Sequence, residues 1–405
     1  MKVMYLTAEG FDTPNPNNQL AMTMIDDFLS AGIEVYMVAS RRKRINSDIP
    51  DILKNREGFT DNIVDRPIVD KTNFIKRYFE EAIYAFRAMG RWHKHRKEID
   101  IVLLQSCPTA LFSITLLKFL LCKPIIYSVF DVFPGSAYEI GVMRNRVIYE
   151  ILIILQKLVY RMSNIIVVIS SDMKKKVIAQ NVSEEKIRII INWYDEKSVV
   201  EVEPSENKFI KKYDIDTTKF YVQFAGTLGY VLDYKMILAI AELLKDEHNI
   251  VFQMIGDGNV KEQFMKEAAD KELSNIVFYP LQPLEIVPDV YSACSICLIP
   301  LKKGVIGNGV PSKASLLMAC RRVVLNAVEE GSDYFKMFNE NNIGVSVSND
   351  DPIKVATAIR DLYNHQDKLT ILAENAKRYG EQYYTRSVNT EKFISLFKEI
   401  YKSKG

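Results

Sequence analysis

Short apolar runs alternate with longer amphipathic stretches along most of this chain. The runs lack the apolar–polar alternation of half-exposed strands, so they fit strands buried on both faces of a parallel sheet. In the first half, strands are predicted at Val3–Thr7, Glu34–Ala39, Ile101–Gln105, Ile125–Val129, Ile165–Ile169 and Ile187–Ile191. In the second half, strands are predicted at Phe220–Ala225, Ile250–Ile255, Ile276–Tyr279, Ile296–Ile299, Val323–Asn326 and Gly344–Val347. Helical stretches between them, such as Gln19–Ala31, complete an α/β pattern.

The alternation is interrupted at Asp195–Asp216. This stretch is polar and contains Pro204, so it predicts a linker between two domains. The predicted division gives residues 1–200 to an N-terminal Rossmann-like domain and residues 201–375 to a C-terminal one. Residues 376–405 are predicted as helices at the end of a helical tail that begins at Asp351.

Composition and charge exclude several classes of protein. The 405 residues are 48% hydrophobic, which is enough for two cores. A net charge of +2 gives no overall argument for nucleic-acid binding. The five cysteines form no secreted disulfide framework, which favours a cytoplasmic location. The most apolar helical stretches, Thr109–Cys122 and Val147–Tyr160, are too short for membrane spans and are interrupted by charge.

Glycine-containing turns follow two neighbouring strands of the second half. Their residues are Gly226, Thr227 and Gly229 in the first turn, and Gly256, Asp257 and Gly258 in the second. The carboxyl ends of parallel strands meet at one sheet edge, and helix N-termini there suit phosphate, so these turns are candidates for a phosphorylated ligand. Ordinary tight turns without a ligand are the alternative. We expect Asp257 to cap the following helix rather than to touch a ligand.

The strongest local indication is the segment Pro311–Lys313. Pro311 fits the first turn of a helix and Ser312 can cap it. Lys313 would then stand at the positive end of a helix dipole, where a cation is disfavoured unless an anion lies beside it. We therefore expect Lys313 to hold a diphosphate and to stabilise it as a leaving group, with a solvated surface lysine as the alternative.

Three further motifs carry carboxylates or thiols. Asp131 follows the predicted strand Ile125–Val129 and could orient an acceptor hydroxyl, although a turn or cap role is the alternative. Cys294 and Cys297 form a CxxC that runs into a predicted buried strand, so we expect no metal or redox role. The DxD at Asp214–Asp216 lies in the predicted linker and is expected to be structural.

The order of these motifs resembles the donor-nucleotide domain of family-4 retaining glycosyltransferases. The resemblance rests on FAGTLG (Phe224–Gly229), MIGDG (Met254–Gly258), FYPLQP (Phe278–Pro283) and IGNGVPSKASLLMACRRVVL (Ile306–Leu325). YSVFDVFPGSA, which contains Asp131, also resembles a segment of that family. The pattern is most similar to bacterial members that build capsule, exopolysaccharide or O-antigen chains.

The resemblance implies a GT-B fold, in which two Rossmann-like, doubly wound parallel-sheet domains face a cleft and the last helix crosses back to the first domain. It implies transfer of a sugar, with retention, from a nucleotide-sugar donor, most often UDP-linked, to a polyprenyl-diphosphate-linked saccharide. The nucleotide sugar is a co-substrate, and neither a cofactor nor a metal ion is implied. The catalytic residues would be Asp131 and Lys313. The donor-binding residues would be Gly226, Thr227, Gly229, Gly256, Asp257, Gly258, Leu281, Gly309, Val310, Pro311 and Ser312.

The chain also departs from the family pattern. Many members carry two glutamates in this region, and the alignment puts Gly309 and Leu316 in their places. Without that pair, recognition of the ribose and of the donor sugar has no assigned residues. Two alternatives stay open: a non-catalytic GT-B partner of an active transferase, which the missing pair favours, and a nucleotide-sugar epimerase or hydrolase, which is the nearest alternative within the fold.

The stretch Lys71–Lys97 is basic, and its apolar residues Ile75, Phe79, Ile83 and Phe86 recur at helical spacing. Such a helix suits an anionic bilayer surface. This predicts a peripheral protein on the inner face of the cell membrane, and a helix packed in the core is the alternative. The residues expected to face the membrane are Phe74, Lys76, Arg77, Arg87, Arg91, Trp92 and Lys94.

Overall fold

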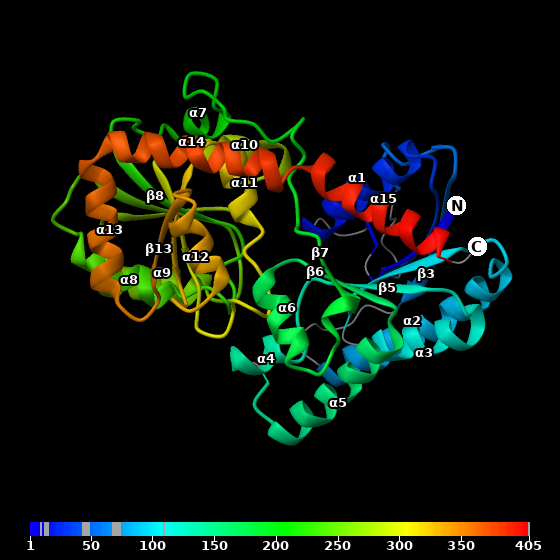
Figure 1. Ribbon diagram of the computed structural model, residues 1–405. Helices are drawn as coiled ribbons and strands as arrows, with labels where there is room; N and C mark the ends of the chain where they lie inside the picture. The colour runs from blue at the N-terminus through cyan, green and yellow to red at the C-terminus, as the bar shows by residue number, and fades with distance from the viewer. Residues whose placement is uncertain are drawn as a thin grey trace. The chain divides into compact units, whose positions relative to one another are not determined.

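The computed structural model describes residues 1–8, 10–11, 16–42, 49–66, 74–107, 110–141 and 143–403, without the side chains at 16, 42, 66, 74–81, 92, 119 and 120. The chain forms two compact units (Figure 1). The first unit comprises Met1–Tyr138, Met143–Ile191 and Arg386–Gly405. The second comprises Glu139–Val142 and Asn192–Thr385. The main boundary between the two units thus falls after Ile191, whereas the sequence predicted it after residue 200.

Within the described ranges, the first unit contains a seven-stranded parallel sheet in the order β3-β2-β1-β4-β5-β6-β7. Its strands are β1 (Lys2–Leu6), β2 (Glu34–Arg42), β3 (Phe59–Arg66), β4 (Ile101–Gln105), β5 (Ile125–Val129), β6 (Ile165–Val168) and β7 (Ile187–Ile189). Its helices are α1 (Pro16–Ser30), α2 (Phe74–Lys94), α3 (Ala110–Leu121), α4 (Gly135–Glu139), α5 (Arg146–Met162), α6 (Ser171–Ile178) and α15 (Arg386–Lys402). The last residue of α4, Glu139, is counted with the second unit. Helices α1 and α15 cover one face of the sheet, and α2, α3 and α5 cover the other (Figure 1).

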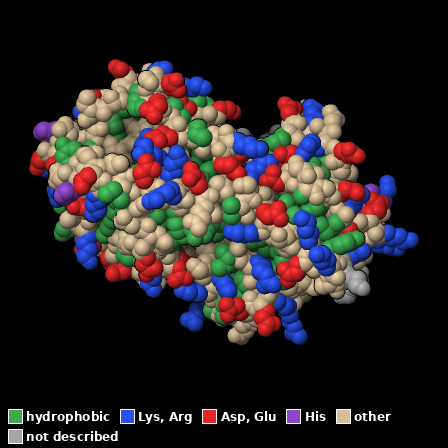
Figure 2. All heavy atoms as spheres, turned by 45° about the horizontal axis from the view of Figure 1, so that its top comes forward, with side chains coloured by type: hydrophobic (Ala, Val, Ile, Leu, Met, Phe, Trp, Pro, Cys, Tyr) green, Lys and Arg blue, Asp and Glu red, His purple; other side chains and the backbone are tan. Residues whose placement is uncertain are grey.

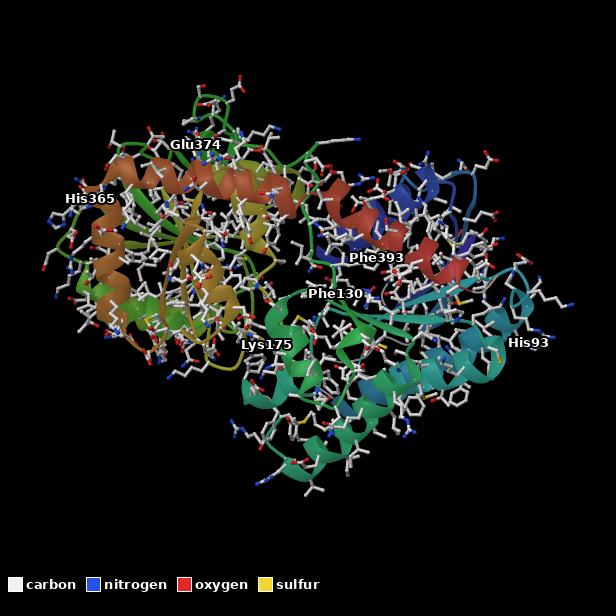
Figure 3. All side chains as sticks on the ribbon, in the orientation of Figure 1. His93, Phe130, Lys175, His365, Glu374 and Phe393 are labelled. Atoms are coloured by element: carbon white, nitrogen blue, oxygen red, sulfur yellow. The ribbon has the colours of Figure 1, made fainter. Side chains whose placement is uncertain are left out.

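The last helix, α15, is held on α1 by charge and by aromatic packing. The Arg386 guanidinium donates to both carboxylate oxygens of Asp27, at 2.9 and 2.6 Å, and to Asp26 at 2.7 Å. Phe393 and Phe397 contact the ring of Phe28 edge-on, with centroids 6.2 and 4.9 Å away (Figure 3). A bidentate arginine–carboxylate pair fixes orientation as well as contact. The tail helix therefore completes the first unit.

The second unit contains, in its described residues, a six-stranded parallel sheet in the order β10-β9-β8-β11-β12-β13. Its strands are β8 (Phe220–Ala225), β9 (Ile250–Ile255), β10 (Ile276–Tyr279), β11 (Ile296–Pro300), β12 (Val323–Val328) and β13 (Gly344–Ser348). Its helices are α7 (Lys208–Tyr213), α8 (Tyr234–Leu243), α9 (Lys261–Asp270), α10 (Val287–Ser292), α11 (Lys313–Ala319), α12 (Asp333–Glu340), α13 (Pro352–Asn364) and α14 (Gln366–Tyr383).

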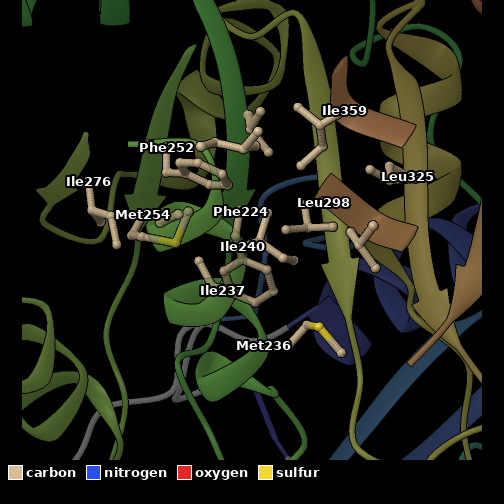
Figure 4. Close-up of a cluster of buried hydrophobic side chains, with 14 of the residues drawn as sticks. Phe224, Met236, Ile237, Ile240, Phe252, Met254, Ile276, Leu298, Leu325 and Ile359 are labelled. Carbon is tan, nitrogen blue, oxygen red and sulfur yellow. The ribbon is translucent and has the colours of Figure 1, made fainter. Parts of the chain in front are cut away.

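Side chains of β8 alternate between two cores. Phe220, Val222 and Phe224 enter one core (Figure 4), and Tyr221 and Ala225 enter the other. This period of two follows from the pleat of a strand, and it explains why β8 reads as a continuous apolar run. The strand order reverses direction beside β8, because β9 and β10 extend the sheet one way and β11 to β13 extend it the other. Ligands of open α/β sheets bind at the carboxyl edge of such a reversal.

Two predictions about local structure were wrong. No strand was predicted at Phe59–Arg66, where β3 pairs with β2 along its whole length. The predicted linker contains α7, whose Phe209 is fully buried. The Asn207 amide, just before α7, also donates to the Asp289 carbonyl at 2.7 Å. This stretch therefore packs as part of the second unit.

Surface charges are mixed in sign. On the face that Figure 2 displays, Lys and Arg side chains are interspersed with Asp and Glu, as the small net charge suggests. None of the helices in the described ranges has both the length and the apolarity that crossing a bilayer requires.

Candidate functional site

The candidate site of the second unit begins where β8 ends. Gly226 follows the last residue of β8, and its N–H donates to the carbonyl of Ile255 at 2.9 Å. The backbone of Gly226 has φ = +139°, a conformation that side chains rarely adopt. The turn after β8 therefore depends on glycine at this position.

The two glycine turns pack directly on each other. The Leu228 N–H donates to the Asp257 carbonyl at 2.9 Å, and the Val260 N–H donates to the Leu228 carbonyl at 3.1 Å. A Cβ on Gly256 would lie 1.9 Å from the Gly226 carbonyl oxygen, and one on Gly258 would lie 2.3 Å from that of Leu228. Gly256 and Gly258 are thus required by the approach of two backbones, whether or not a ligand binds.

Lys313 reaches the first of these turns. Its ammonium lies 3.5 Å from the centre of the Phe224 ring, and a Cβ on Gly226 would lie 3.1 Å from Lys313 Nζ. Cation–π contact stabilises an ammonium without neutralising it. Among the residues that the structure describes, none forms a hydrogen bond or ion pair with this ammonium.

Burial lowers the pKa of Lys313 to about 8. The neighbouring Cys297 thiol is also buried, and desolvation raises its pKa to about 12, so it supplies no thiolate at neutral pH. A cation that is desolvated without a partner anion is costly, and it indicates a group that a bound anion would complete. The turn and Lys313 together are therefore suited to a diphosphate.

Two predicted caps were wrong. Helix α9 starts after Val260 without a side-chain cap, and the Asp257 carboxylate instead accepts from the N–H of Gly258 at 2.9 Å. Ser312 precedes α11, but its side chain makes no capping hydrogen bond. Ser312 has helical backbone angles, φ −61° and ψ −23°, whereas a capping residue is typically extended. Helix α11 itself has only seven residues.

The other predicted donor-binding residues lie on exposed or half-buried loops. Thr227 is exposed, and its hydroxyl has no hydrogen-bond partner among the described residues. Leu281, after β10, is 65% exposed. Gly309, Val310 and Pro311 are half-buried in the loop before α11.

Asn308 was not among the predicted site residues. The two family glutamates are eight positions apart, and counting back from Leu316 reaches Asn308, so the assignment to Gly309 was wrong. Asn308 is 1% exposed, and its side-chain nitrogen donates to Glu139 at 2.8 Å and to the Gly304 carbonyl at 2.7 Å. Its buried side-chain oxygen has no hydrogen-bond partner in the described part of the chain.

Glu139 belongs to the second unit with the rest of Glu139–Val142, although it lies far from Asn308 in sequence. A carboxylate therefore does reach the loop before α11. It comes from α4, and not from the positions of Asn308 or Leu316. Asn308 is the sequence neighbour of Gly309, which had been assigned to the position of the first glutamate. No sequence pattern near Glu139 predicts that its carboxylate contacts this loop.

Asp131 lies in the first unit, two residues after β5, next to Phe130, which is labelled in Figure 3. Its side chain is exposed and has no hydrogen-bond or ion-pair partner in the described ranges. Although the carboxyl touches solvent, the protein that surrounds it limits its solvation and raises the pKa of Asp131 above its ordinary value. The side chain thus makes no capping contact with the described residues.

The residues predicted to face a membrane lie on α2. The side chains of Phe74, Lys76, Arg77 and Trp92 lie outside the described residues. The other three, Arg87, Arg91 and Lys94, are exposed. Arg87 donates to the Asp65 carbonyl at 2.8 Å, and Arg91 donates to Asn62 Oδ1 at 2.5 Å.

The CxxC and DxD motifs have structural positions. Cys294 and Cys297 are buried beside and within β11, and burial raises the pKa of the Cys294 thiol. Asp214 ends α7 in a left-handed conformation, and Asp216 accepts hydrogen bonds from the N–H and hydroxyl of Thr218.

Family models match both halves of the chain. Residues 18–198 match the model described as Glycosyltransferase Family 4, and residues 205–379 match the model described as Glycosyl transferases group 1. Among curated proteins, the probable glycosyltransferase WbjE of Pseudomonas aeruginosa is 26% identical over 337 residues, which are 82% of this chain and 83% of WbjE.

Solved structures share the fold. HepE from Anabaena, crystallised with UDP, superposes with a TM-score of 0.75 at 12% identity, covering 98% of this chain and 100% of HepE. WaaG, a glycosyltransferase involved in lipopolysaccharide biosynthesis, gives a TM-score of 0.68 at 14% identity, covering 97% of this chain and 99% of WaaG. With two parallel-sheet units that match such structures end to end, the chain is a glycosyltransferase of family 4 with the GT-B fold.

Proposed function

We propose that this glycosyltransferase moves a sugar from a UDP-linked donor to a lipid-linked saccharide, with retention of the anomeric configuration. The reaction would serve the synthesis of a bacterial surface polysaccharide at the cytoplasmic face of the membrane. The observation that carries the proposal is the Lys313 ammonium, which is desolvated, lies beside Gly226, and has no anionic partner among the described residues.

The donor diphosphate binds on the turn Gly226–Gly229, with Lys313 as its cation. As the bond from the sugar to the diphosphate breaks, negative charge grows on the leaving oxygen. A fixed ammonium in a site that excludes water stabilises this charge more than it stabilises the intact donor. Thr227 adds a hydroxyl donor, and Asp131 orients the acceptor hydroxyl, whose proton passes to the leaving diphosphate.

Relatives support the donor and the product class. HepE has been crystallised with UDP and with UDP-glucose, and WaaG takes part in lipopolysaccharide biosynthesis. The chemistry of Lys313 does not depend on which sugar is attached, because the ammonium contacts only the diphosphate.

The test replaces Lys313 with alanine. We expect UDP binding, measured by calorimetry, to weaken about 10- to 100-fold, and sugar transfer to fall about 100- to 1,000-fold. The stability of the empty protein should not fall, because the substitution removes a desolvated charge.

The matched control is Lys303→Ala, on the same loop. Lys303 is exposed and pairs only weakly with Asp350, at 3.7 Å. We expect it to retain UDP affinity and turnover. If Lys313→Ala binds UDP as tightly as the parent protein, the diphosphate site is elsewhere.

The rival chemistry is hydrolysis or epimerisation of the nucleotide sugar. Incubation with a UDP-sugar and a membrane-lipid extract separates the two. With a label in the sugar, movement of the label into the lipid fraction supports transfer. Release of free sugar or formation of an epimerised donor, with the same yield whether or not lipid is present, supports the rival.

A further inference from the structure

Helix α5 presents a row of aliphatic side chains to solvent. Val147, Ile151, Ile154 and Leu158 are 68, 52, 60 and 42% exposed, and Ile148 beside them is 44% exposed. Steps of four, three and four residues keep the first four on one helical face. These five residues are called the α5 row. Amphipathic helices of globular proteins normally turn such a face inward.

The opposite face of α5 makes the contacts with the first unit. Its buried residues are Leu152, Gln156, Val159 and Tyr160, so half of them carry polar groups. The helix therefore buries a mixed face and exposes a purely aliphatic one. Single exposed apolar residues are common on protein surfaces, but a contiguous row of this kind marks an interaction surface.

The surroundings of the α5 row are apolar and basic. Helix α3 contacts both α5 and α2, and the three helices form one layer (Figure 1). On α2, Ile83 and Phe86 are also exposed, at 41 and 55%. The described side chains of the three helices carry seven Lys or Arg residues and one acid, Glu150. The basic residues are Arg87, Arg91, Lys94, Lys118, Arg146, Lys157 and Arg161.

The charge is arranged along the row. At 3.6 residues per turn, Arg146, Lys157 and Arg161 fall on one edge of the α5 row, and all three are exposed. Glu150 lies on the same edge and comes no closer than 3.9 Å to Arg146. Among the described residues, Lys157 and Arg161 have no ion-pair partner. An aliphatic face with a cationic edge is therefore open to solvent.

We propose that the α5 row docks the protein on an anionic lipid bilayer, with α5 lying along the headgroup region and its basic edge against the lipid phosphates. This surface differs from the one predicted on α2, which would lie beside it. The inference rests on the proposed function, since a lipid-linked acceptor brings the enzyme to a membrane. A helix with an aliphatic face and a cationic border is typical of interfacial membrane binding.

A second copy of the chain fits this face less well. An antiparallel pair of α5 rows about a two-fold axis would bring two basic edges together, with only the Glu150 of each copy to offset them among the described side chains of α5. Anionic headgroups neutralise the same edge without that repulsion.

The test is vesicle flotation with the full chain. Vesicles contain phosphatidylglycerol and phosphatidylcholine in equal parts, or phosphatidylcholine alone. The double variant Ile151→Asp/Ile154→Asp places two carboxylates in the α5 row. We expect it to lose at least tenfold in partition to anionic vesicles at low salt, while the parent protein floats.

The matched control is Ile353→Asp/Ile371→Asp, on α13 and α14 of the second unit. These isoleucines are 62 and 54% exposed, so the chemical change and the exposure are alike. The control should float like the parent protein. A third variant, Lys157→Glu/Arg161→Glu, should lose binding to anionic vesicles and lose its dependence on salt. Circular dichroism and thermal melting verify that each variant is folded.

Either of two results overturns the proposal. One is unchanged flotation of Ile151→Asp/Ile154→Asp. The other is a concentration-dependent dimer in light scattering that this variant abolishes while the parent protein fails to float, which would make the α5 row a self-association surface. UDP binding separates this proposal from the proposed function. The α5 variant should bind UDP normally, and Lys313→Ala should float normally, so each proposal can fail alone.

Discussion

The turns after β8 and β9 look alike in sequence, but their glycines meet different neighbours. Gly226 leaves space for the tip of a flexible side chain, the Lys313 ammonium. Gly256 leaves space for the rigid carbonyl of Gly226 itself. The first glycine serves a functional group, and the second serves the backbone that positions it. A glycine in a strand-end turn therefore does not by itself indicate a ligand, and what its missing Cβ would meet decides between the two roles.

The largest effect is expected on stability, at Gly256, the glycine whose missing Cβ makes room for the backbone. Gly256→Ala would place a Cβ 1.9 Å from a carbonyl oxygen at φ = +146°, so the backbone of both turns must shift. We expect the free energy of unfolding to fall by about 3 kcal/mol or more. Urea unfolding monitored by circular dichroism measures it.

Gly331→Ala and Asp257→Ala are the controls for that measurement. A Cβ on Gly331 meets nothing within 4 Å, and the Asp257 side chain makes one local hydrogen bond. Each should change stability by less than about 1 kcal/mol. Equal stability of Gly256→Ala and Gly331→Ala would contradict the tight approach of the two turns.

Gly226→Ala tests the other side of the comparison. Its Cβ would displace Lys313 Nζ, which a lysine can accommodate, and would strain a backbone at φ = +139°. We expect a stability loss of about 1 to 3 kcal/mol, smaller than for Gly256→Ala, and UDP affinity reduced roughly tenfold or more. Calorimetric titration measures the UDP affinity of this variant, with Gly331→Ala as the control. Full UDP affinity would mean that the ammonium does not act from this position.

The smallest effect is a dependence on pH. The pKa of Lys313 is lowered to about 8 in the empty protein, so the fraction of ammonium is high below pH 8 and falls above it. A bound diphosphate favours the ammonium, so UDP affinity should fall by up to about tenfold per pH unit above pH 8. Titrations between pH 7 and 9.5 measure this slope. Lys313→Ala should show none, and a pH-independent affinity in the parent protein would rule out a protonated Lys313 in the complex.

The sequence predicts strands well where both faces are buried. The bounds of β4, β5, β8 and β9 match the predicted runs, because a strand in the middle of a parallel sheet must be apolar on both faces. The edge strand β10 was also predicted with its observed bounds, since its sequence IVFY is a continuous apolar run. Strand β3 was missed because it is an edge strand of sequence FTDNIVDR. Its polar side chains break up the apolar run that would have predicted a strand, although its backbone pairs with β2. Helix α7 was missed because it spans six residues, of which Phe209 is fully buried while Ile210 and Tyr213 pack only partly against the core.

The site was predictable as far as local sequence determines it. The turns at Gly226 and Gly256 and the position of Lys313 follow from motifs within a few residues of strand ends. The contact from Asn308 to Glu139 does not, because 169 residues separate the two. The caps assigned to Asp257 and Ser312 were wrong because other groups determine those helix starts: Asp257 turns back to Gly258, and Ser312 is itself helical.

The packing of α15 on α1 has a consequence for synthesis on the ribosome. Asp26, Asp27 and Phe28 emerge early, but their partners Arg386, Phe393 and Phe397 follow only after the entire second unit has been translated. Translation of Asn192–Thr385 alone takes on the order of ten to forty seconds at ordinary elongation rates. During that interval the nascent amino-terminal unit carries an uncovered aromatic and acidic surface, which makes it a candidate client for chaperones, and the polypeptide closes that surface with its final helix.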